Sequence, residues 1–390
     1  MVDRSGDVVF RNVILLGIVS LLQDISSEMI HPLLPLFLVG MGAGSVIVGL
    51  IGGLGDMLNS LGNLLSGVYS DILGKKKPLA FLGYVASAIS KVLLVAASAW
   101  EHVLVYRVID RAGKGIRTSP RDALLSASVS PRKVGWGFGL HRAMDTSGAV
   151  LGSALAFVAA SIFMMPYNYI FLIAAILAFL ALIPFSAIVE RPTQTKTNRM
   201  SFHLRGLPYG LKAFILISTL FTLSNFSYMF FILKAAKGVE AGVLPLILYM
   251  LFNVSYAVSA FPFGILSDKL GRIPVLFLGY ILFSLTCLGF STLEGNVWPF
   301  ILFAAYGISY ALFDGNQRAM VSDLSPEGSR GAAFGTFHAL TSVAALLSST
   351  IAGLLWEAFG THAPFLYGAI LSSISAVALL SLGLKLRKVL

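Results

Sequence analysis

Long apolar runs alternate with short polar breaks along the whole chain. A helix needs about 20 apolar residues to cross the hydrocarbon core of a bilayer, and runs of this length recur twelve times. The spans expected from this pattern are residues 12–39, 45–70, 77–99, 103–127, 134–161, 168–190, 212–236, 243–266, 273–293, 298–324, 330–359 and 363–385. The pattern therefore predicts an all-α membrane protein with twelve transmembrane helices.

Composition and charge placement agree with this prediction. The chain is 57% hydrophobic and only 12% charged, whereas a soluble domain carries about 25% charged residues. The net charge of +10 comes from Lys and Arg in alternate breaks, such as Lys75–Lys77 and Lys269–Arg272. Such a bias marks the cytoplasmic side of a membrane protein. We therefore expect a multi-pass protein of the cell (inner) membrane with both termini in the cytoplasm, and no nucleic-acid partner.

One polar phrase occurs twice. The segment GVYSDILGKKK begins at Gly67, and GILSDKLGR begins at Gly264, 197 residues later. Arg121 and Arg318 repeat at the same offset, and a basic, proline-bounded stretch separates the two halves. We expect an N-terminal six-helix bundle at residues 1–190, a cytoplasmic linker at 191–211 and a C-terminal bundle at 212–390, related as parallel repeats.

The two phrases match the G-x-L-x-D-x-x-G-R/K-K/R loop signature of the major facilitator superfamily (MFS). Together with Arg107 in the fourth span and the twelve-span layout, they make the chain resemble an MFS secondary transporter over essentially its whole length. Tyr69 stands where the family often has Leu. The resemblance implies that two bundles rock about a central site, and it leaves the substrate open.

The resemblance also implies a cytoplasmic gate. In it, the Asp of each phrase would pair with an Arg at the inner end of the fourth span of its own half, and with a helix N-terminus of the other bundle. The alternative is that these charges only end helices and anchor topology. The expected gate comprises Gly67, Asp71, Gly74, Arg121, Gly264, Asp268, Gly271 and Arg318.

Ionisable residues inside the spans form stripes. At about 100° per residue, the following sets each lie on one helix face: Asp24, Glu28 and His31; Asp56, Asn59, Ser60 and Asn63; Arg107, Asp110, Arg111, Lys114, Arg117 and Arg121; His141, Asp145, Gly148 and Gly152. Charged side chains within a bilayer rarely face lipid. We therefore expect the stripes of the first half to meet at a water-accessible centre.

The acidic stripe residues are candidate proton carriers. Asp24 and Glu28 lie one turn apart and are expected to titrate as a coupled pair, and the resemblance implies the same, because proton-coupled relatives keep acids in the first span and an Arg in the fourth. The proton-coupling set is Asp24, Glu28, Asp56 and Asp145. Two alternatives remain open: a static salt-bridge core, or direct cation ligation, for which His31 near Asp24 and Glu28 is the one arrangement.

The expected substrate-binding residues are Arg107, Asp110, Arg111, Lys114, His141, Arg142, Asn225 and Asn253. Their near-neutral charge balance suits zwitterions, weak acids or amphipathic organic solutes. Aromatic residues of the second half, among them Phe252 and Tyr256, are either an apolar wall of the site or ordinary packing.

Antiporters of the superfamily carry a G-x-x-x-G-P motif in the fifth span. Here Gly148 and Gly152 are followed by Ser153, which weakens an assignment as an exporter and favours a simple role in close helix packing.

We expect proton-coupled export of a small organic solute by a monomer. The alternatives are import of an organic anion, transport of a metal or metal chelate, and a receptor or lipid-handling role. The sequence lacks GxxxxGK[ST] and HExxH, so we expect no enzyme activity, no cofactor and no metal site.

Overall fold

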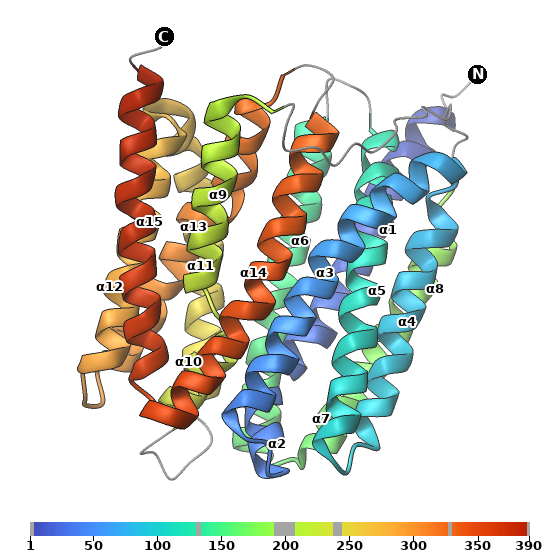
Figure 1. The fold of residues 1–390 in the computed structure, drawn as a ribbon. Coiled ribbons are helices and arrows are strands. Elements are labelled where there is room, and N and C mark those ends of the chain that lie inside the picture. Colours follow the sequence, from blue (N-terminus) through green and yellow to red (C-terminus); the bar gives the residue numbers. More distant parts are fainter. Residues whose placement is uncertain (1–3, 130–133, 191–206, 237–243, 327–329, 388–390) are drawn as a thin grey trace. The chain divides into compact units, whose positions relative to one another are not determined.

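The computed structural model describes residues 4–129, 134–190, 207–236, 244–326 and 330–387, and these residues form helices and no strand (Figure 1). The helices of the first half are α1 (Arg4–Ile30), α2 (Leu34–Gly40), α3 (Ser45–Leu73), α4 (Lys77–Val95), α5 (Trp100–Ala127), α6 (Val134–Phe157), the π-helical turn η2 (Val158–Ile162), α7 (Tyr167–Leu180) and α8 (Leu182–Ser186). Those of the second half are α9 (Tyr209–Ser224), α10 (Tyr228–Ala236), α11 (Leu244–Leu270), α12 (Arg272–Thr292), α13 (Trp298–Leu324), α14 (Arg330–Phe359) and α15 (Ala363–Arg387).

Each of the twelve predicted spans corresponds to one helix or to two consecutive helices. Among the described residues, ten helical segments are long and apolar enough to cross a membrane. α5 and α13 complete the twelve; they are of similar length but include charged residues within the helix. The predicted all-α fold of twelve transmembrane helices is confirmed.

The first span of each half is broken, whereas the sequence pattern predicted continuous spans. α1 ends before Pro32, which has no N–H to donate to a helix. α9 ends at Asn225, where the backbone leaves the helical region. Two serines of α14 hold this second break: Ser348 donates to the carbonyl of Leu223 at 2.7 Å, and Ser349 Oγ accepts from the Ser227 N–H at 3.0 Å. Broken helices are tolerated at membrane depth when protein groups satisfy the freed backbone in this way.

The contacts divide the chain into two compact units. Unit 1 comprises Met1–Gly42 and Leu58–Arg199, and unit 2 comprises Ala43–Met57 and Met200–Leu390. The first half of α3 therefore belongs with the second set of helices, where Ser45 donates to the carbonyl of Gly353 in α14 at 3.1 Å. The predicted N-terminal bundle at residues 1–190, linker at 191–211 and C-terminal bundle at 212–390 stay a prediction.

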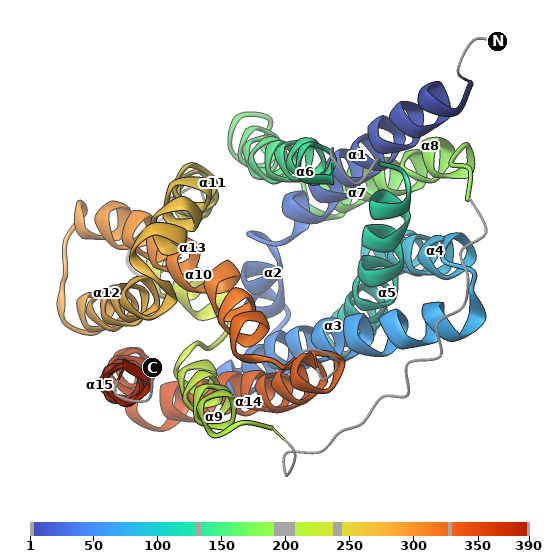
Figure 2. The ribbon, with the colours of Figure 1, turned by 90° about the horizontal axis from the view of Figure 1, so that it is seen from above.

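The two units repeat the same helix pairings. In unit 1, α1 packs on α6, α4 on α5, and α4 on α7; in unit 2, α9 packs on α14, α12 on α13, and α12 on α15 (Figure 2). In both units the first and last helices also meet. Asn12 donates to the carbonyl of Val189 at 2.8 Å, and Gly210 lies against Leu386. A six-span bundle must start and finish on one side of the membrane.

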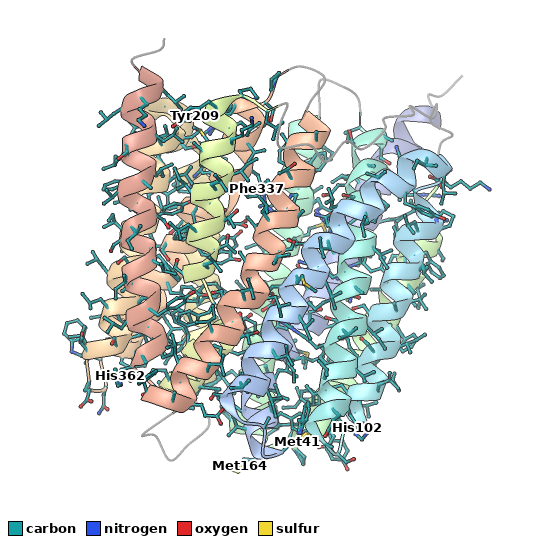
Figure 3. The ribbon with its side chains drawn as sticks, in the orientation of Figure 1. Met41, His102, Met164, Tyr209, Phe337 and His362 are labelled. Carbon is teal, nitrogen blue, oxygen red and sulfur yellow. The ribbon has the colours of Figure 1, made fainter. Side chains whose placement is uncertain are left out.

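The loops that follow the first, third and fifth spans of unit 1 lie together. Figure 3 places Met41, His102 and Met164 at one end of this unit. Met41 follows the first span, His102 lies at the start of α5 just after the third, and Met164 follows the fifth. The helices of unit 1 therefore alternate in direction as the span prediction requires.

Candidate functional site

Polar and charged side chains of α1, α4, α5 and α6 meet in the interior of unit 1. Lys91 is completely buried, and Arg107, Asp110 and Arg117 are almost so. Charged groups at such positions are expensive unless other polar groups surround them. The sequence must therefore allow four helices to pack around a polar centre.

Glycines allow the close helix packing. A Cβ at Gly148 of α6 would lie 2.7 Å from the carbonyl oxygen of Leu21 and 3.1 Å from Cβ of Asp24, and one at Gly152 would lie 2.9 Å from Cβ of Glu28. No side chain fits at either position. The role of Gly148 and Gly152 in helix packing, which the sequence predicted, is confirmed, and it brings α6 against the acidic stripe of α1.

Asp24 of α1 and Asp145 of α6 form an acidic pair. Their carboxyl groups lie close enough to interact directly, and two carboxyl groups so placed are expected to share one proton. Ser20 Oγ donates to Oδ1 of Asp145 at 2.6 Å, and Arg142 Nη1 lies 3.2 Å from Oδ2. Lys114 of α5 lies close enough to Asp24 to interact with its charge. We call Asp24 and Asp145 the carboxyl dyad. The sequence predicted that Asp24 is coupled to Glu28. The charge of Glu28 does act on Asp24, and Asp145 of α6 is a further and stronger partner.

Glu28 belongs to a second group. Nδ1 of His31 lies 3.0 Å from Oε1 of Glu28, and Arg111 of α5 donates to Nε2 of His31. Because Nε2 accepts, Nδ1 carries the hydrogen that Glu28 accepts. Arg111 also lies 3.4 Å from the carboxylate of Asp110. The sequence placed His31 on the right stripe but assigned it only to possible ion ligation. Among the described residues, no group of three or more His, Cys, Asp or Glu side chains can hold a metal ion.

A third group, which the sequence analysis missed, surrounds Lys91 of α4. Lys91 Nζ donates to Ser26 and Ser27 of α1 at 2.7 and 3.1 Å, and it interacts electrostatically with Asp110. Ser87, one turn earlier on α4, donates to Asp110. Asp110 is therefore enclosed by protein groups. The missed signal was the run of hydroxyl and amide residues on α1, which continues the acidic stripe at helical spacing.

The buried arginines of α5 differ in their surroundings. Arg107 is 1% exposed, and its Nε and Nη1 have no hydrogen-bond partner in the part of the chain that the structure describes. Arg117 lies over the ring of Tyr84, 4.7 Å from its centroid, a favourable cation–π arrangement. Arg107 thus has donors available for a ligand, while Arg117 is held by the protein.

The remaining candidates are divided between the units. His141 is buried near Arg121 and Asp145, and Arg142 is exposed; both belong to unit 1. Asp56, Asn225 and Asn253 lie in unit 2, Asn253 buried on α11 and Asn225 at the break between α9 and α10. The structure brings together the predicted residues of α1, α5 and α6.

The loop glycines of the expected gate have the backbone conformation that requires glycine. Gly74 and Gly271 have φ angles of +63° and +89°, a region that other residues rarely adopt. Gly67 lies against Ser119, whereas a Cβ at Gly264 would have no neighbour within 4 Å.

The charged gate residues have local partners. Arg121 pairs with Asp122 at 2.8 Å, Asp268 with Arg272 at 2.6 Å, and Arg318 with Asp314 at 2.8 Å. The side chain of Asp71 lies outside the described part of the structure. The gate therefore stays a prediction.

Glu190 contacts the loop that follows the first signature phrase, and the sequence analysis did not predict a role for it. Its carboxylate accepts from the backbone N–H groups of Lys76 and Lys77 at 2.5 and 3.2 Å, at the start of α4. A carboxylate at this position satisfies free N–H groups and complements the helix dipole. Glu190 thus fixes the end of unit 1 to the loop after the first signature phrase.

Two repeated sets of membrane-spanning helices, one with an internal charged network, define an α-helical membrane transporter. A family model described as Major Facilitator Superfamily matches residues 16–249 and 213–388. The chain belongs to the major facilitator superfamily, as its loop phrases indicated, and it is a multi-pass membrane protein of the secondary transporter class.

Relatives of known sequence or structure agree. The chain is 45% identical over 378 residues to an uncharacterised MFS-type transporter of Methanocaldococcus jannaschii, covering 95% of this chain and 94% of the relative. An uncharacterised protein of Mycobacterium bovis is 23% identical over 366 residues, covering 89% of this chain and 87% of that protein.

Two solved structures share the fold. The human organic anion transporter MFSD10 matches with a TM-score of 0.71 and 17% identity, over 95% of this chain and 99% of that one. The nucleoside transporter NupG matches with a TM-score of 0.78 and 16% identity, over 95% and 98%.

Proposed function

We propose that this protein exports a small organic solute in exchange for protons, and that the carboxyl dyad of Asp24 and Asp145 carries the proton. The observation that carries the proposal is that two carboxyl groups from different helices lie side by side where α6 packs closely on α1. A carboxyl pair with one proton between them, held by two different helices, can lose that proton when the helices move.

The surroundings of the dyad suit this role. Lys114 and Arg142 lie close to the two acids, so both carboxylates have a cation nearby after the proton leaves. Ser20 keeps Asp145 in place in either state through its hydrogen bond. The dyad would take a proton from the outer side, release it to the cytoplasm, and return deprotonated during the half-cycle that exports the solute.

The organic nature of the solute is inferred from the lining of the network. It offers acids, bases and amide or hydroxyl groups in close succession, which suits polar groups on a small organic molecule. The organic anion and nucleoside transporters that share this fold carry such solutes by name, which supports the class and not a particular compound.

A second candidate is proton-driven uptake of an organic anion. Arg107 favours it, because a buried guanidinium with available donors is well suited to bind a carboxylate. The two candidates predict opposite directions of solute flow in the same pH gradient.

We further propose that the protein lies in the cell membrane with both termini in the cytoplasm. The excess of Lys and Arg in the loops on the side of Lys75–Lys77 and Lys269–Arg272 supports this orientation.

The test is transport by purified protein in liposomes with an imposed pH gradient, using a panel of labelled organic solutes. Exchange predicts that solute accumulates in the more acidic compartment as protons leave it, and that Asp145→Asn abolishes this accumulation. Glu294→Gln, an exposed loop residue, serves as the control and should transport normally. A wild-type level of pH-driven accumulation by Asp145→Asn would contradict the proposal, and accumulation in the less acidic compartment would favour anion uptake.

A further inference from the structure

Unit 2 contains an aromatic cluster that the proposed proton pathway does not use. It is formed by Phe252 and Tyr256 of α11 and by Tyr306 and Tyr310 of α13. The rings of Phe252 and Tyr306 stack with centroids 4.6 Å apart, and those of Tyr256 and Tyr310 meet edge to face at 5.7 Å. Gly307 brings the two helices together, because a Cβ there would lie 2.5 Å from the carbonyl oxygen of Phe252.

Two carboxylates adjoin the aromatic cluster. The hydroxyl of Tyr256 donates to Oδ2 of Asp314 at 3.3 Å. Asp56, in the part of α3 that belongs to unit 2, interacts electrostatically with the hydroxyls of both Tyr306 and Tyr310, and Asp314 does so with Tyr310. Carboxylates among aromatic rings at membrane depth are costly in a purely structural core, which indicates a use for their charge.

The cluster is not closed by its own contacts. Tyr306 is 3% exposed, and its ring stacks on that of Phe252. Phe252, Tyr256 and Tyr310 keep part of their surface exposed. Partly open ring faces are therefore available to a ligand.

Arg318 is the cation already near Asp314. Arg318 Nη2 lies 2.8 Å from Oδ2 of Asp314, but the Arg318 side chain is 50% exposed. Exposed pairs four residues apart on one helix contribute little to stability. His338 of α14 also interacts with both residues. A positively charged ligand at the carboxylate would compete with Arg318 for Asp314.

We propose that the aromatic cluster, with Asp56 and Asp314, binds an organic cation, such as a quaternary ammonium or protonated amine. Ring faces attract a cation through their quadrupole, and the two carboxylates supply the neutralising charge. This inference rests on the proposed transport function, because it assigns a positively charged group to the transported solute.

Binding of benzyltrimethylammonium to the full chain in lipid nanodiscs, measured by calorimetry, tests this site. Benzoate, an aromatic anion of similar size, is the comparison. Wild type should bind benzyltrimethylammonium and prefer it to benzoate, and the double variant Asp56→Asn/Asp314→Asn should bind it at least about tenfold more weakly. Phe252→Leu should also weaken binding, because it removes a ring face and keeps an apolar side chain.

Two further variants make the result specific. Asp323→Asn changes an acid at the far end of α13, where it pairs with Arg272, and should bind normally. Asp314→Glu keeps the charge and should restore most of the affinity lost in Asp314→Asn. The proposal is overturned if wild type does not bind the cation, if benzoate binds equally well, or if the double variant keeps wild-type affinity.

The same measurements separate this site from the proton dyad. Asp145→Asn should keep its affinity for benzyltrimethylammonium at fixed pH while losing proton-driven transport. If Asp145→Asn loses proton-driven transport but wild type does not bind the cation, only the cation site is rejected. If wild type binds the cation but shows no proton-coupled transport, only the proposed exchange is rejected.

Discussion

The carboxyl group of Asp24 in α1 lies beside that of Asp145 in α6, close enough for the two groups to interact directly. They meet because Gly148, three residues after Asp145, lets α6 approach the backbone of α1. The chemistry of the dyad and the packing of the two helices are therefore coupled. In the proposed coupling, a motion that separates α1 from α6 would change the protonation of the pair.

Replacing either acid should uncouple transport. Asp24→Asn and Asp145→Asn each remove the shared proton, so we expect solute flux driven by a pH gradient to fall by about tenfold or more. Exchange of solute down its own gradient should continue. Flux measurements in liposomes with and without a pH gradient check both expectations, and a variant that loses both kinds of flux to the same degree would argue against a role in coupling.

The glycine seam should be sensitive to a single methyl group. Gly148→Ala places a Cβ against the Leu21 carbonyl and Asp24, so we expect a loss of stability of about 1–3 kcal/mol together with reduced proton coupling. Gly139→Ala on the same helix is the matched control, because its Cβ would have no neighbour within 4 Å. Equal behaviour of the two variants would show that the close approach is unimportant.

The single cysteine provides an unfolding assay. Cys287 is fully buried, so its reaction with a fluorescent maleimide during heating reports the unfolding of unit 2, and a cysteine introduced at a buried position of unit 1 does so there.

Lys91 and Asp110 should stabilise the protein only when both are present. Lys91→Met leaves Asp110 without its nearby ammonium and should cost about 3 kcal/mol. Adding Asp110→Asn should recover part of this loss, because the buried carboxylate is then gone. Thermal unfolding of the two single variants and the double variant gives the coupling between the sites, and strictly additive effects would mean that Lys91 and Asp110 do not depend on one another.

The two loop glycines should resist substitution. Gly74→Ala and Gly271→Ala force an L-residue into a left-handed backbone conformation, at a cost of about 1–2 kcal/mol each. Gly264→Ala, inside α11 with free space around its Cβ, should be neutral or stabilising. Thermal unfolding of the three variants ranks them, and an unchanged midpoint for Gly271→Ala would contradict the expected strain.

Periodicity predicted much of the fold and part of the site. The stripes of α1, α5 and α6 placed Asp24, Lys114 and Asp145 on faces that do meet within unit 1. The spacing of Gly148 and Gly152 predicted a close helix contact. These features are local, because a helix repeats every 3.6 residues and its polar face is set by spacing alone.

The sequence could not give the partners across helices. Asp24 and Glu28 lie on one stripe, but Asp24 lies beside Asp145 of α6 and Glu28 bonds to His31, and tertiary packing decides these partners. No proline lies at the break at Asn225, so the local sequence does not predict it. The break depends on serines of α14 more than a hundred residues away. The aromatic cluster likewise depends on how α3, α11 and α13 assemble.

Infrared difference spectroscopy of the purified protein measures the protonation of the dyad directly and needs no identified solute. At neutral pH the wild type should show the carbonyl stretch of a protonated carboxyl group in a buried site, and this band should be absent from both Asp24→Asn and Asp145→Asn. An identical protonated-carboxyl band in the wild type and in both variants would contradict the assignment of the proton to this pair.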